Sequence, residues 1–375
     1  MPWQERSVMS ERQEFVVFAR QEGATISALC ERYGISRKTG YKWLRRAANG
    51  DQALADRSRR PRSSPTQTRP DLEARILELR TAHPSWGGRK LHHRLVATGM
   101  VDVPAPSTIT AILRRHGLLA PEPVPRDFLR FAHPAPNDVW QMDFMGHRPL
   151  DHGRVHPWTL LDDHSRFALG LRACANEQHT TVKDQLTAAF RRYGLPRAIL
   201  SDNGSPWATA GRGGLTALEA WLLRLGVAPW HGAFAHPQTQ GKVERFHGTI
   251  AAEVFAHRHL ATLGAAQAQF DAFRCCYNLE RPHEALAYAV PASRYQPSPR
   301  SFPETVPLVA YGPDEVVRTV SIHGSISWRT RRFFISRGLV GEPVALRPTR
   351  ETAVWAVVYC HRQVATIDLD HPDEV

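Results

Sequence analysis

The sequence predicts a multidomain α/β protein, with helical units at its N-terminal end, a mixed α/β core and a small antiparallel β domain at its C-terminal end. Three patterns predict this fold class. Apolar residues recur at helical spacing within residues 1–48 and 71–120, and strand-like and helix-like segments alternate from 137 to 298. Short runs rich in Val, Ile and aromatic residues then fill positions 299–375. A chain of 375 residues has room for roughly two to four domains.

Residues 1–48 predict a helix-turn-helix domain. An apolar helix face at residues 15–19 precedes a second helix at 25–33, and Gly34 supplies the turn before a third helix at 37–47. Ser36 is the expected N-cap of the third helix. That helix carries the side chains that we expect to reach base edges and phosphates in a major groove, namely Arg37, Lys38, Tyr41, Lys42, Arg45 and Arg46. The alternative is an ordinary three-helix core with a basic exterior.

The distribution of charge favours DNA binding over that alternative. The chain has a net charge of +12 and a pI near 10.0. Residues 1–120 hold 21 Lys and Arg against 11 Asp and Glu, whereas residues 121–375 hold 27 against 25. A protein that is basic only to stay soluble would not concentrate its positive charge at one end. A nucleic-acid-binding arm explains the asymmetry.

Two linkers and a second helical unit follow. Residues 49–70 form a basic linker rich in Pro and Ser, in which Arg59 and Arg62 can pair with phosphate oxygens; the alternative is a solvated tether. Apolar residues at helical spacing in 71–120 predict a second helix-turn-helix-like unit. The Pro-rich residues 121–136 form the next linker, before the core at 137–298.

The core is expected to begin with three strands and then to alternate helices and strands. The candidate strands are 139–145, 157–162, 166–173, 197–202 and 226–231, and the candidate helices are 179–193, 214–225, 240–257 and 264–278. Beyond residue 298, six short strand-like runs separated by turns predict a small antiparallel barrel or sheet over 299–375.

Three acidic residues occupy positions suited to a divalent-metal site. Asp143 lies in an apolar, aromatic run that predicts a buried strand, Asp202 ends a second such run, and Glu244 lies in a predicted helix. A buried Asp needs a partner or a metal, and carboxylate oxygens are the ligands that Mg²⁺ prefers. Two such ions roughly 3.5–4 Å apart can activate the attacking oxygen and stabilise the leaving oxygen of a phosphodiester. Asp162 and Asp163 are rival acids, but their position between two apolar runs predicts a structural role in a hairpin turn.

Seven motifs follow one another in the core. They are WQMDF at 140–144, LLDDHSRF at 160–167, GLP at 194–196, LSDNGSPW at 200–207, HPQTQGKVERFHGT at 236–249, YNLERPHEAL at 277–286 and PASRYQPS at 291–298. In this order they resemble the motifs of the DDE transposases and integrases of bacterial insertion sequences, whose core is shared with retroviral integrases. One departure is the spacing of 41 residues between Asp202 and Glu244, which is longer than usual and is consistent with an enlarged Gly-rich loop at 208–215.

The resemblance implies a ribonuclease-H-like core in which Asp143, Asp202 and Glu244 are the catalytic residues and the ligands of two Mg²⁺ ions, with Mn²⁺ as a substitute. It implies that the protein binds the terminal inverted repeats of a mobile element, cleaves at its ends and joins the 3′-hydroxyl to target DNA. The partners would be double-stranded DNA and at least one further copy of the chain. A DNA-contact role carries over to Arg89, Lys90, Ser107 and Thr108.

Four further residues near the acids are candidates for contacts with DNA. Lys242 and Arg245 flank Glu244 and can neutralise phosphate charge, and Asn203 can orient the Asp202 carboxylate or contact DNA. His247 lies three residues beyond Glu244 on the same helical face, where it can position water or phosphate. Two alternatives stay open: a nuclease of similar fold that cuts without joining, and a DNA-binding regulator whose core does not catalyse.

Nothing in the sequence predicts a membrane partner. No apolar run approaches the roughly 18 residues of a membrane span, and the N-terminal residues lack the apolar stretch of a secretion signal. The five cysteines are scattered and odd in number, which favours a reducing compartment. We therefore expect a cytoplasmic, nucleoid-associated bacterial protein.

Overall fold

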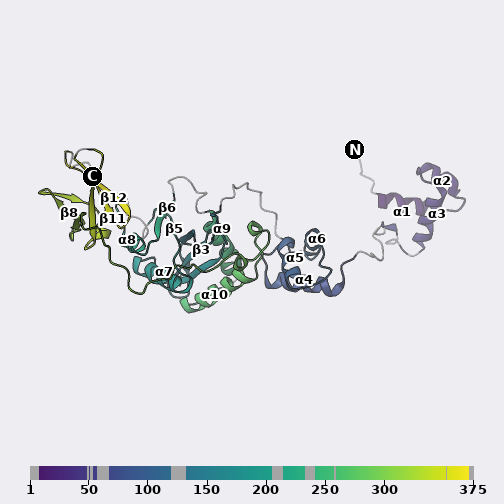
Figure 1. Cartoon of the computed structure of the whole chain (residues 1–375). Coiled ribbons are helices and arrows are strands. Elements are labelled where there is room, and N and C mark those ends of the chain that lie inside the picture. Colours follow the sequence, from purple (N-terminus) through teal and green to yellow (C-terminus); the bar gives the residue numbers. More distant parts are fainter. Residues whose placement is uncertain are drawn as a thin grey trace. The chain divides into compact units, whose positions relative to one another are not determined.

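The computed structural model describes residues 8–48, 50, 54–56, 67–119, 132–204, 214–232, 241–256, 259–351 and 353–370 (Figure 1). The chain divides into two compact units, Met1–Gln67 and Thr68–Val375. Within the described ranges, every helix is too short or too polar to cross a membrane.

The first unit is a three-helix domain. Its helices are α1 (Val8–Ala19), α2 (Ile26–Arg32) and α3 (Arg37–Ala47). Phe15, Cys30 and Trp43 form its centre. The predicted cap is present, because the Ser36 hydroxyl accepts a hydrogen bond from the Thr39 amide at 3.2 Å. The helices approach closely at Gly40, where an added Cβ would lie 2.5 Å from the Cys30 Sγ. The expected helix-turn-helix architecture is confirmed.

The second helical region packs against the core within the second compact unit. Its helices are α4 (Pro70–Ala82), α5 (Gly88–Ala97) and α6 (Pro106–Arg115), which enclose the fully buried Trp86. Arg94 donates to the Glu280 carboxylate at 2.5 Å, and the His93 ring stacks on the Tyr288 ring with 4.2 Å between centroids. Cys276 packs against the apolar centre of the three helices. These contacts attach the region to the core.

A mixed sheet forms the centre of the core. Its strands are β1 (Val139–Phe144), β2 (Arg148–Pro149), β3 (Arg154–Asp162), β4 (Ala168–Cys174), β5 (Ala198–Ser201) and β6 (Ala228–His231). β3 lies between β1 and β4 in antiparallel pairing, and β2 pairs with the start of β3. β5 is parallel to β1, and β6 is parallel to β5. Three antiparallel strands followed by two parallel strands are the arrangement that a ribonuclease-H-like core requires.

Helices cover both faces of this sheet. They are α7 (His179–Tyr193), α8 (Ala217–Arg224), α9 (Gly241–Ile250) and α10 (Leu263–Leu279). Trp140 and Trp158 face α7 and α8 on one side, while Leu161 and Leu171 face α9 and α10 on the other. The predicted helix at 240–257 is interrupted, because α9 gives way to a π-helical turn, Ala251–Phe255.

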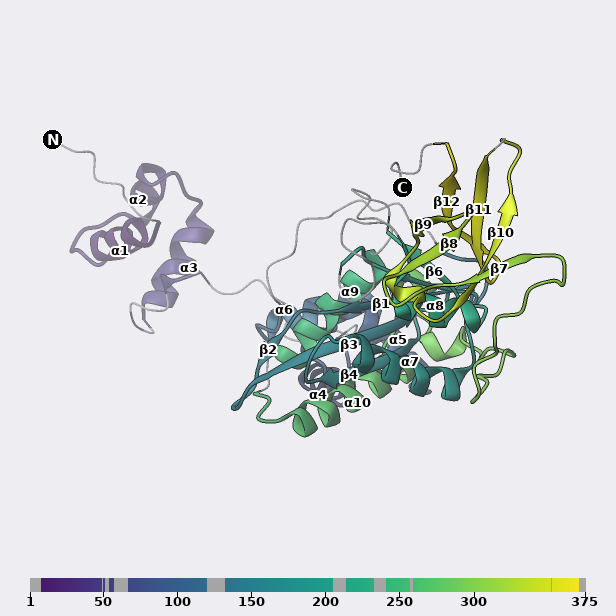
Figure 2. The same ribbon diagram turned by 90° about the vertical axis from the view of Figure 1, so that its left-hand side faces the viewer.

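The C-terminal region consists of antiparallel strands, as the sequence predicts. They are β7 (Val316–Thr319), β8 (Ser325–Trp328), β9 (Arg331–Phe334), β10 (Pro343–Pro348), β11 (Val354–Tyr359) and β12 (Arg362–Asp368). Four of them form a sheet in the order β12-β11-β10-β7, and β8 pairs with β9. Its apolar centre includes Leu215 and Leu223 from around α8, so this β domain packs directly on the core (Figure 2).

Candidate active site

Two of the three acids are placed side by side by the strand register. β1 and β5 are parallel, with Val139 opposite Ala198 and Gln141 opposite Leu200. Continuing this register by two residues brings Asp143, near the end of β1, level with Asp202, which directly follows β5. Neighbouring strands lie about 4.8 Å apart, and residues at one level of a parallel pair point to the same face. The two carboxylates therefore share one edge of the sheet.

Glu244 approaches this edge from α9. The Val243 amide donates to the Gln141 side-chain oxygen at 3.3 Å, which ties the first turn of α9 to β1. Glu244 follows directly and is exposed. Its charge acts on Asp143, since Glu244 is among the groups that raise the pKa of that carboxyl. The strand register and the charge interaction therefore place the three predicted acids at the same end of the sheet, although their carboxylate oxygens do not all lie within 4.8 Å of one another.

The electrostatics of this edge suit a divalent cation. Burial, reinforced by the charge of Asp202, raises the pKa of Asp143 to about 7. Three neighbouring carboxylates repel one another, and a bound Mg²⁺ would neutralise that repulsion with the oxygen ligands it prefers. The residues present therefore fit the metal that the family resemblance implies.

His247 lies beside Asp143. Its Nε2 is 2.8 Å from the Thr159 hydroxyl, which donates to the Asp143 carbonyl at 2.9 Å. Because the hydroxyl proton is used there, the ring donates through Nε2, and its Nδ1 faces the Asp143 Oδ2 at 4.0 Å. Burial lowers the pKa of His247 to about 4, so the ring is neutral at neutral pH. His247 thus contacts the acid site through Asp143.

The rival acids hold the turn between β3 and β4, in agreement with the structural role predicted for them. Asp162 accepts from the Asn137 amide at 2.8 Å and from the Ser165 amide and hydroxyl at 2.8 and 2.6 Å. Asp163 accepts from the His133 amide and the Gln141 side chain, each at 2.8 Å.

Lys242 differs from the expectation of a phosphate ligand. Its ammonium group forms an ion pair with Asp163, and burial lowers the pKa of Lys242 to about 8. The positive charge is therefore directed at the β3–β4 turn, which the sequence did not indicate. Arg245, the residue directly after Glu244, is exposed.

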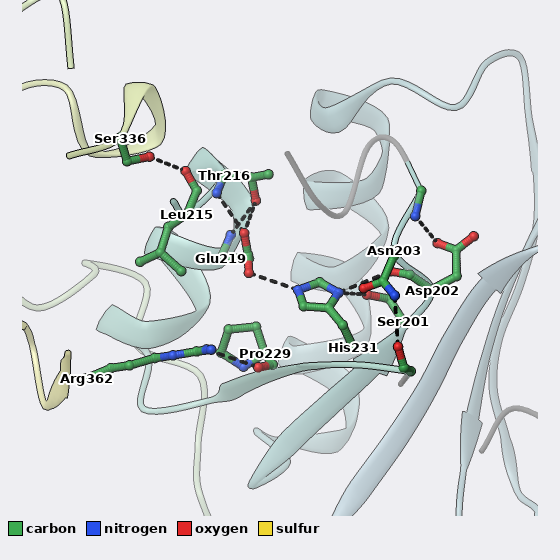
Figure 3. Close-up of polar contacts among 12 residues, drawn as sticks. Ser201, Asp202, Asn203, Leu215, Thr216, Glu219, Pro229, His231, Ser336 and Arg362 are labelled. Atoms are coloured by element: carbon green, nitrogen blue, oxygen red, sulfur yellow. Dashed lines mark hydrogen bonds and ion pairs between the residues drawn. The ribbon is translucent and has the colours of Figure 1, made fainter. Parts of the chain in front are cut away.

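His231 and Glu219, which contact the main chain at Asp202, were not predicted from the sequence (Figure 3). The His231 ring lies 2.9 Å from the Glu219 carboxylate through Nε2 and 3.1 Å from the Asp202 carbonyl through Nδ1. The hydrogen bond to Glu219 raises the pKa of His231. Asn203 donates to the Gly232 carbonyl at 2.8 Å, so it links the turn after β5 to the end of β6. The Thr216-x-x-Glu219 capping signature was the only advance signal of this pair.

The predicted DNA face of α3 is open to solvent. Arg37, Lys38, Tyr41, Lys42 and Arg45 are all exposed, and Tyr41 keeps 53% of its surface accessible. Their spacing leaves Trp43 and Ala47 on the opposite, buried face. Arg59 and Arg62 lie outside the residues that the structure describes.

The four candidates in the second helical region divide into two groups. Ser107 and Thr108, in the first turn of α6, are exposed. Arg89 is exposed but lies 4.0 Å from the Glu284 carboxylate of the core. Lys90 is half-buried, and its burial lowers the pKa of the amine to about 8, with Arg281, Glu253 and Glu284 as charged neighbours. The structure therefore places Lys90 against the core, whereas the family resemblance implied a contact with DNA.

Comparisons with known families agree with this architecture. An integrase core domain matches residues 133–237, and a second integrase core model matches 225–291. The C-terminal domain of IS481 family transposases matches residues 315–374. A helix-turn-helix domain matches residues 11–62, and a homeodomain-like domain matches 39–113. The matched segments follow the order of the observed regions.

Relatives occur in bacterial insertion elements. The chain is 27% identical over 230 residues to an uncharacterized 31.7 kDa protein of insertion element IS407 from Burkholderia multivorans, covering 59% of this chain and 79% of that protein. It is 26% identical over 232 residues to a 39.2 kDa protein of IS476 from Xanthomonas euvesicatoria, covering 61% and 65%.

A solved structure with similarity is the simian T-cell lymphotropic virus intasome in complex with PP2A regulatory subunit B56 gamma. The match has a TM-score of 0.37 and 17% identity, and covers 77% of this chain and 99% of that one. The family matches and the insertion-element relatives together support an insertion-sequence transposase with an integrase core domain preceded by helix-turn-helix DNA-binding domains.

Proposed function

We propose that this transposase binds the terminal inverted repeats of its mobile element, cleaves DNA at the element ends and joins the exposed 3′-hydroxyl to target DNA. The observation that carries the proposal is the β1–β5 register, which brings Asp143 level with Asp202, together with the charge of Glu244 acting on Asp143. Acids that converge at one sheet edge of an integrase-type core suit phosphodiester transfer.

Asp143, Asp202 and Glu244 would hold two Mg²⁺ ions, with Mn²⁺ as a substitute. When bound, such ions activate the attacking oxygen and stabilise the leaving oxygen. The chain itself supplies the positioning. Thr159 fixes the main chain at Asp143, and His247 braces Thr159 from α9. The hydrogen bond from the Gly204 amide to the Asp202 carboxylate, at 3.1 Å, sets the direction of the second acid.

The DNA partners would bind through several parts of the chain. The exposed basic face of α3 suits a major groove, and Ser107 and Thr108 on α6 suit contacts with a second stretch of DNA. Arg245 and Asn203 lie beside the acids and are suited to the phosphates around the cut. Because two element ends must be processed together, the working complex contains at least two copies of the chain, in the nucleoid of a bacterial cytoplasm.

Neutralising the three acids one at a time tests the proposal. Asp143→Asn, Asp202→Asn and Glu244→Gln should each abolish Mg²⁺-dependent nicking of a labelled element end, because a neutral amide is a poorer Mg²⁺ ligand than a carboxylate. Mobility-shift binding of the same end should stay nearly unchanged. Glu78→Gln, which removes an exposed carboxylate on α4, is the matched control.

A second measurement separates joining from cutting. An oligonucleotide with a free 3′-hydroxyl should yield branched strand-transfer product when incubated with target DNA and Mg²⁺. Cutting without any branched product would identify a nuclease, and near-normal strand transfer by any of the three variants would refute the site.

A further inference from the structure

A continuous set of hydrogen bonds leads away from Asp202 into the interior of the core (Figure 3). The His231 Nδ1 lies 3.1 Å from the Asp202 carbonyl, and its Nε2 lies 2.9 Å from the Glu219 Oε1. A carbonyl and a carboxylate can only accept, so each of these two hydrogen bonds needs a proton on the ring nitrogen that makes it, and Nδ1 also lies 3.4 Å from the Ser201 hydroxyl. The ring therefore connects the main chain at Asp202 to a carboxylate on α8.

Both carboxylate oxygens of Glu219 accept hydrogen bonds. Its other carboxylate oxygen accepts from the Thr216 amide at 2.7 Å and from the Thr216 hydroxyl at 3.0 Å. The Thr216 hydroxyl accepts in return from the Glu219 amide at 3.2 Å, which completes a capping box. Only 6% of the residue is exposed. A buried acid with all these partners cannot change its rotamer without losing several hydrogen bonds.

The C-terminal β domain contacts both ends of this arrangement. The buried Ser336 hydroxyl donates to the carbonyl of Leu215, the residue before Thr216, at 2.5 Å. Arg362 on β12 donates to the carbonyl of Pro229, two residues before His231, at 3.2 Å. At Gly338 the two backbones approach so closely that an added Cβ would overlap the Leu215 carbonyl. These contacts fix the position of the C-terminal β domain against the core segments that carry Glu219 and His231.

We infer that Glu219 and His231 are positioning residues for Asp202, and that the C-terminal domain holds this pair in place through Ser336 and Arg362. The inference rests on the proposed role of Asp202 as a metal ligand. Mg²⁺ demands near-ideal octahedral geometry, so a small displacement of one carboxylate weakens binding. Removing a group that is hydrogen-bonded to a metal-ligating residue typically lowers metal affinity or activity by about 10–100-fold.

Two substitutions in the full chain test the pair. His231→Phe removes the ring hydrogen bonds to Asp202, Glu219 and Ser201, and Glu219→Gln keeps the size of the side chain but removes its charge. Two readouts are needed: the rise in unfolding temperature caused by MgCl₂ without DNA, and the Mg²⁺ concentration that gives half-maximal nicking. We expect His231→Phe to raise the half-maximal concentration by about 10-fold or more, to shrink the thermal shift, and to leave binding of element ends unchanged.

A matched control is available in the second helical region. His116 lies 2.8 Å from the Glu73 carboxylate, so His116→Phe breaks a histidine–glutamate pair of the same kind away from Asp202. This variant should keep the Mg²⁺ dependence of the wild type. If His231→Phe lowers the unfolding temperature but leaves both Mg²⁺ readouts at wild-type values, the pair is merely structural and the inference is wrong.

The role of the C-terminal domain has its own test. Ser336→Ala and Arg362→Ala should move both Mg²⁺ readouts in the same direction as His231→Phe, by a smaller factor, while His361→Ala on the adjacent exposed position should not. Wild-type Mg²⁺ dependence in both anchoring variants would overturn this part. If the proposed role of Asp202 as a metal ligand is wrong, Asp202→Asn will nick DNA normally. If Asp202→Asn is inactive but His231→Phe has normal Mg²⁺ dependence, only the positioning role is refuted.

Discussion

Asp162 and Asp143 are both largely removed from solvent, but their hydrogen-bond partners differ. Asp162 is fully buried and directs both oxygens at donors in the β3–β4 turn. Asp143 keeps 22% of its side chain exposed, and its pKa is raised by burial and by the charge of Asp202. Burial raises the pKa of Asp162 as well, but there the hydrogen bonds from Ser165 and Asn137 oppose the rise, whereas at Asp143 the charge of Asp202 adds to it.

Substitution by Asn should therefore have opposite consequences at these two positions. Asp162→Asn replaces an acceptor oxygen with a donor facing other donors, and should lower the free energy of unfolding by about 1–3 kcal/mol. Asp143→Asn should leave that free energy unchanged or raise it while abolishing nicking. Urea denaturation of both variants in metal-free buffer checks this; equal losses of stability would contradict the assignment.

His283 should make the protein sensitive to acid. Burial lowers the pKa of His283 to about 3, and the charges of Arg281, Lys90 and Arg166 act in the same direction. The pKa of a histidine in the unfolded chain is about 6.5, so the unfolded state binds the proton first, and the free energy of unfolding falls as the pH drops from that value towards about 3. His283→Gln should flatten this dependence of the unfolding free energy, measured by urea titration between pH 7 and about 4. His361→Gln, on an exposed turn, serves as the control.

At the scale of elements, the sequence pattern of a segment was sufficient to predict its secondary structure where that structure depends on the segment alone. The predicted helix at 179–193 coincides with α7, because its apolar residues recur at helical spacing and Gly194 ends it with φ of 78°. The order of the core strands and the Ser36 cap were likewise predictable. The ion pair of Lys242 with Asp163 and the burial of Lys90 were not, since each depends on a contact between segments far apart in the sequence.

The charged face of α3 leads to a prediction about salt dependence. Each phosphate contact that is lost should reduce the slope of log K against log[salt] by about 0.9 for duplex DNA. Lys42→Ala and Arg45→Ala should each weaken binding of the element ends and lower that slope by roughly one unit, measured by fluorescence anisotropy. Glu14→Ala on α1 is a control of opposite charge. An unchanged slope in both variants would exclude α3 from the phosphate contacts.

At the scale of the whole molecule, the second helical region is attached to the core and the first three helices form a separate compact unit. The attachment is both polar and apolar. Ser85 donates to Glu253 at 2.5 Å, Arg94 to Glu280 at 2.5 Å, and Cys276 packs against the helices. The second helical region and the core, which the sequence assigns to different domains, are therefore in direct contact.

Two truncations should therefore behave differently. A chain of residues 68–375 should unfold at the same temperature as the second unit does within the full-length chain. A chain of residues 120–375 should unfold several degrees lower, because Glu253, Glu280 and Cys276 lose their partners and each kcal/mol lost is worth about 2–4 °C in a domain of this size. Circular dichroism melting compares the two, and mobility shifts should show that the shorter chain no longer recognises element ends. Equal melting temperatures would mean that the attachment contributes no stability.

The repulsion among the acids has an evolutionary consequence. Under the proposed mechanism, activity depends on a carboxylate whose charge its surroundings disfavour, so Asp143→Asn would remove that repulsion and leave the exposed basic face of α3 unchanged. A decayed copy with Asp143→Asn would persist as a well-folded protein that still occupies the element's termini. Inactivated relatives of this chain would thus act as competitive inhibitors of the mobile copies beside them.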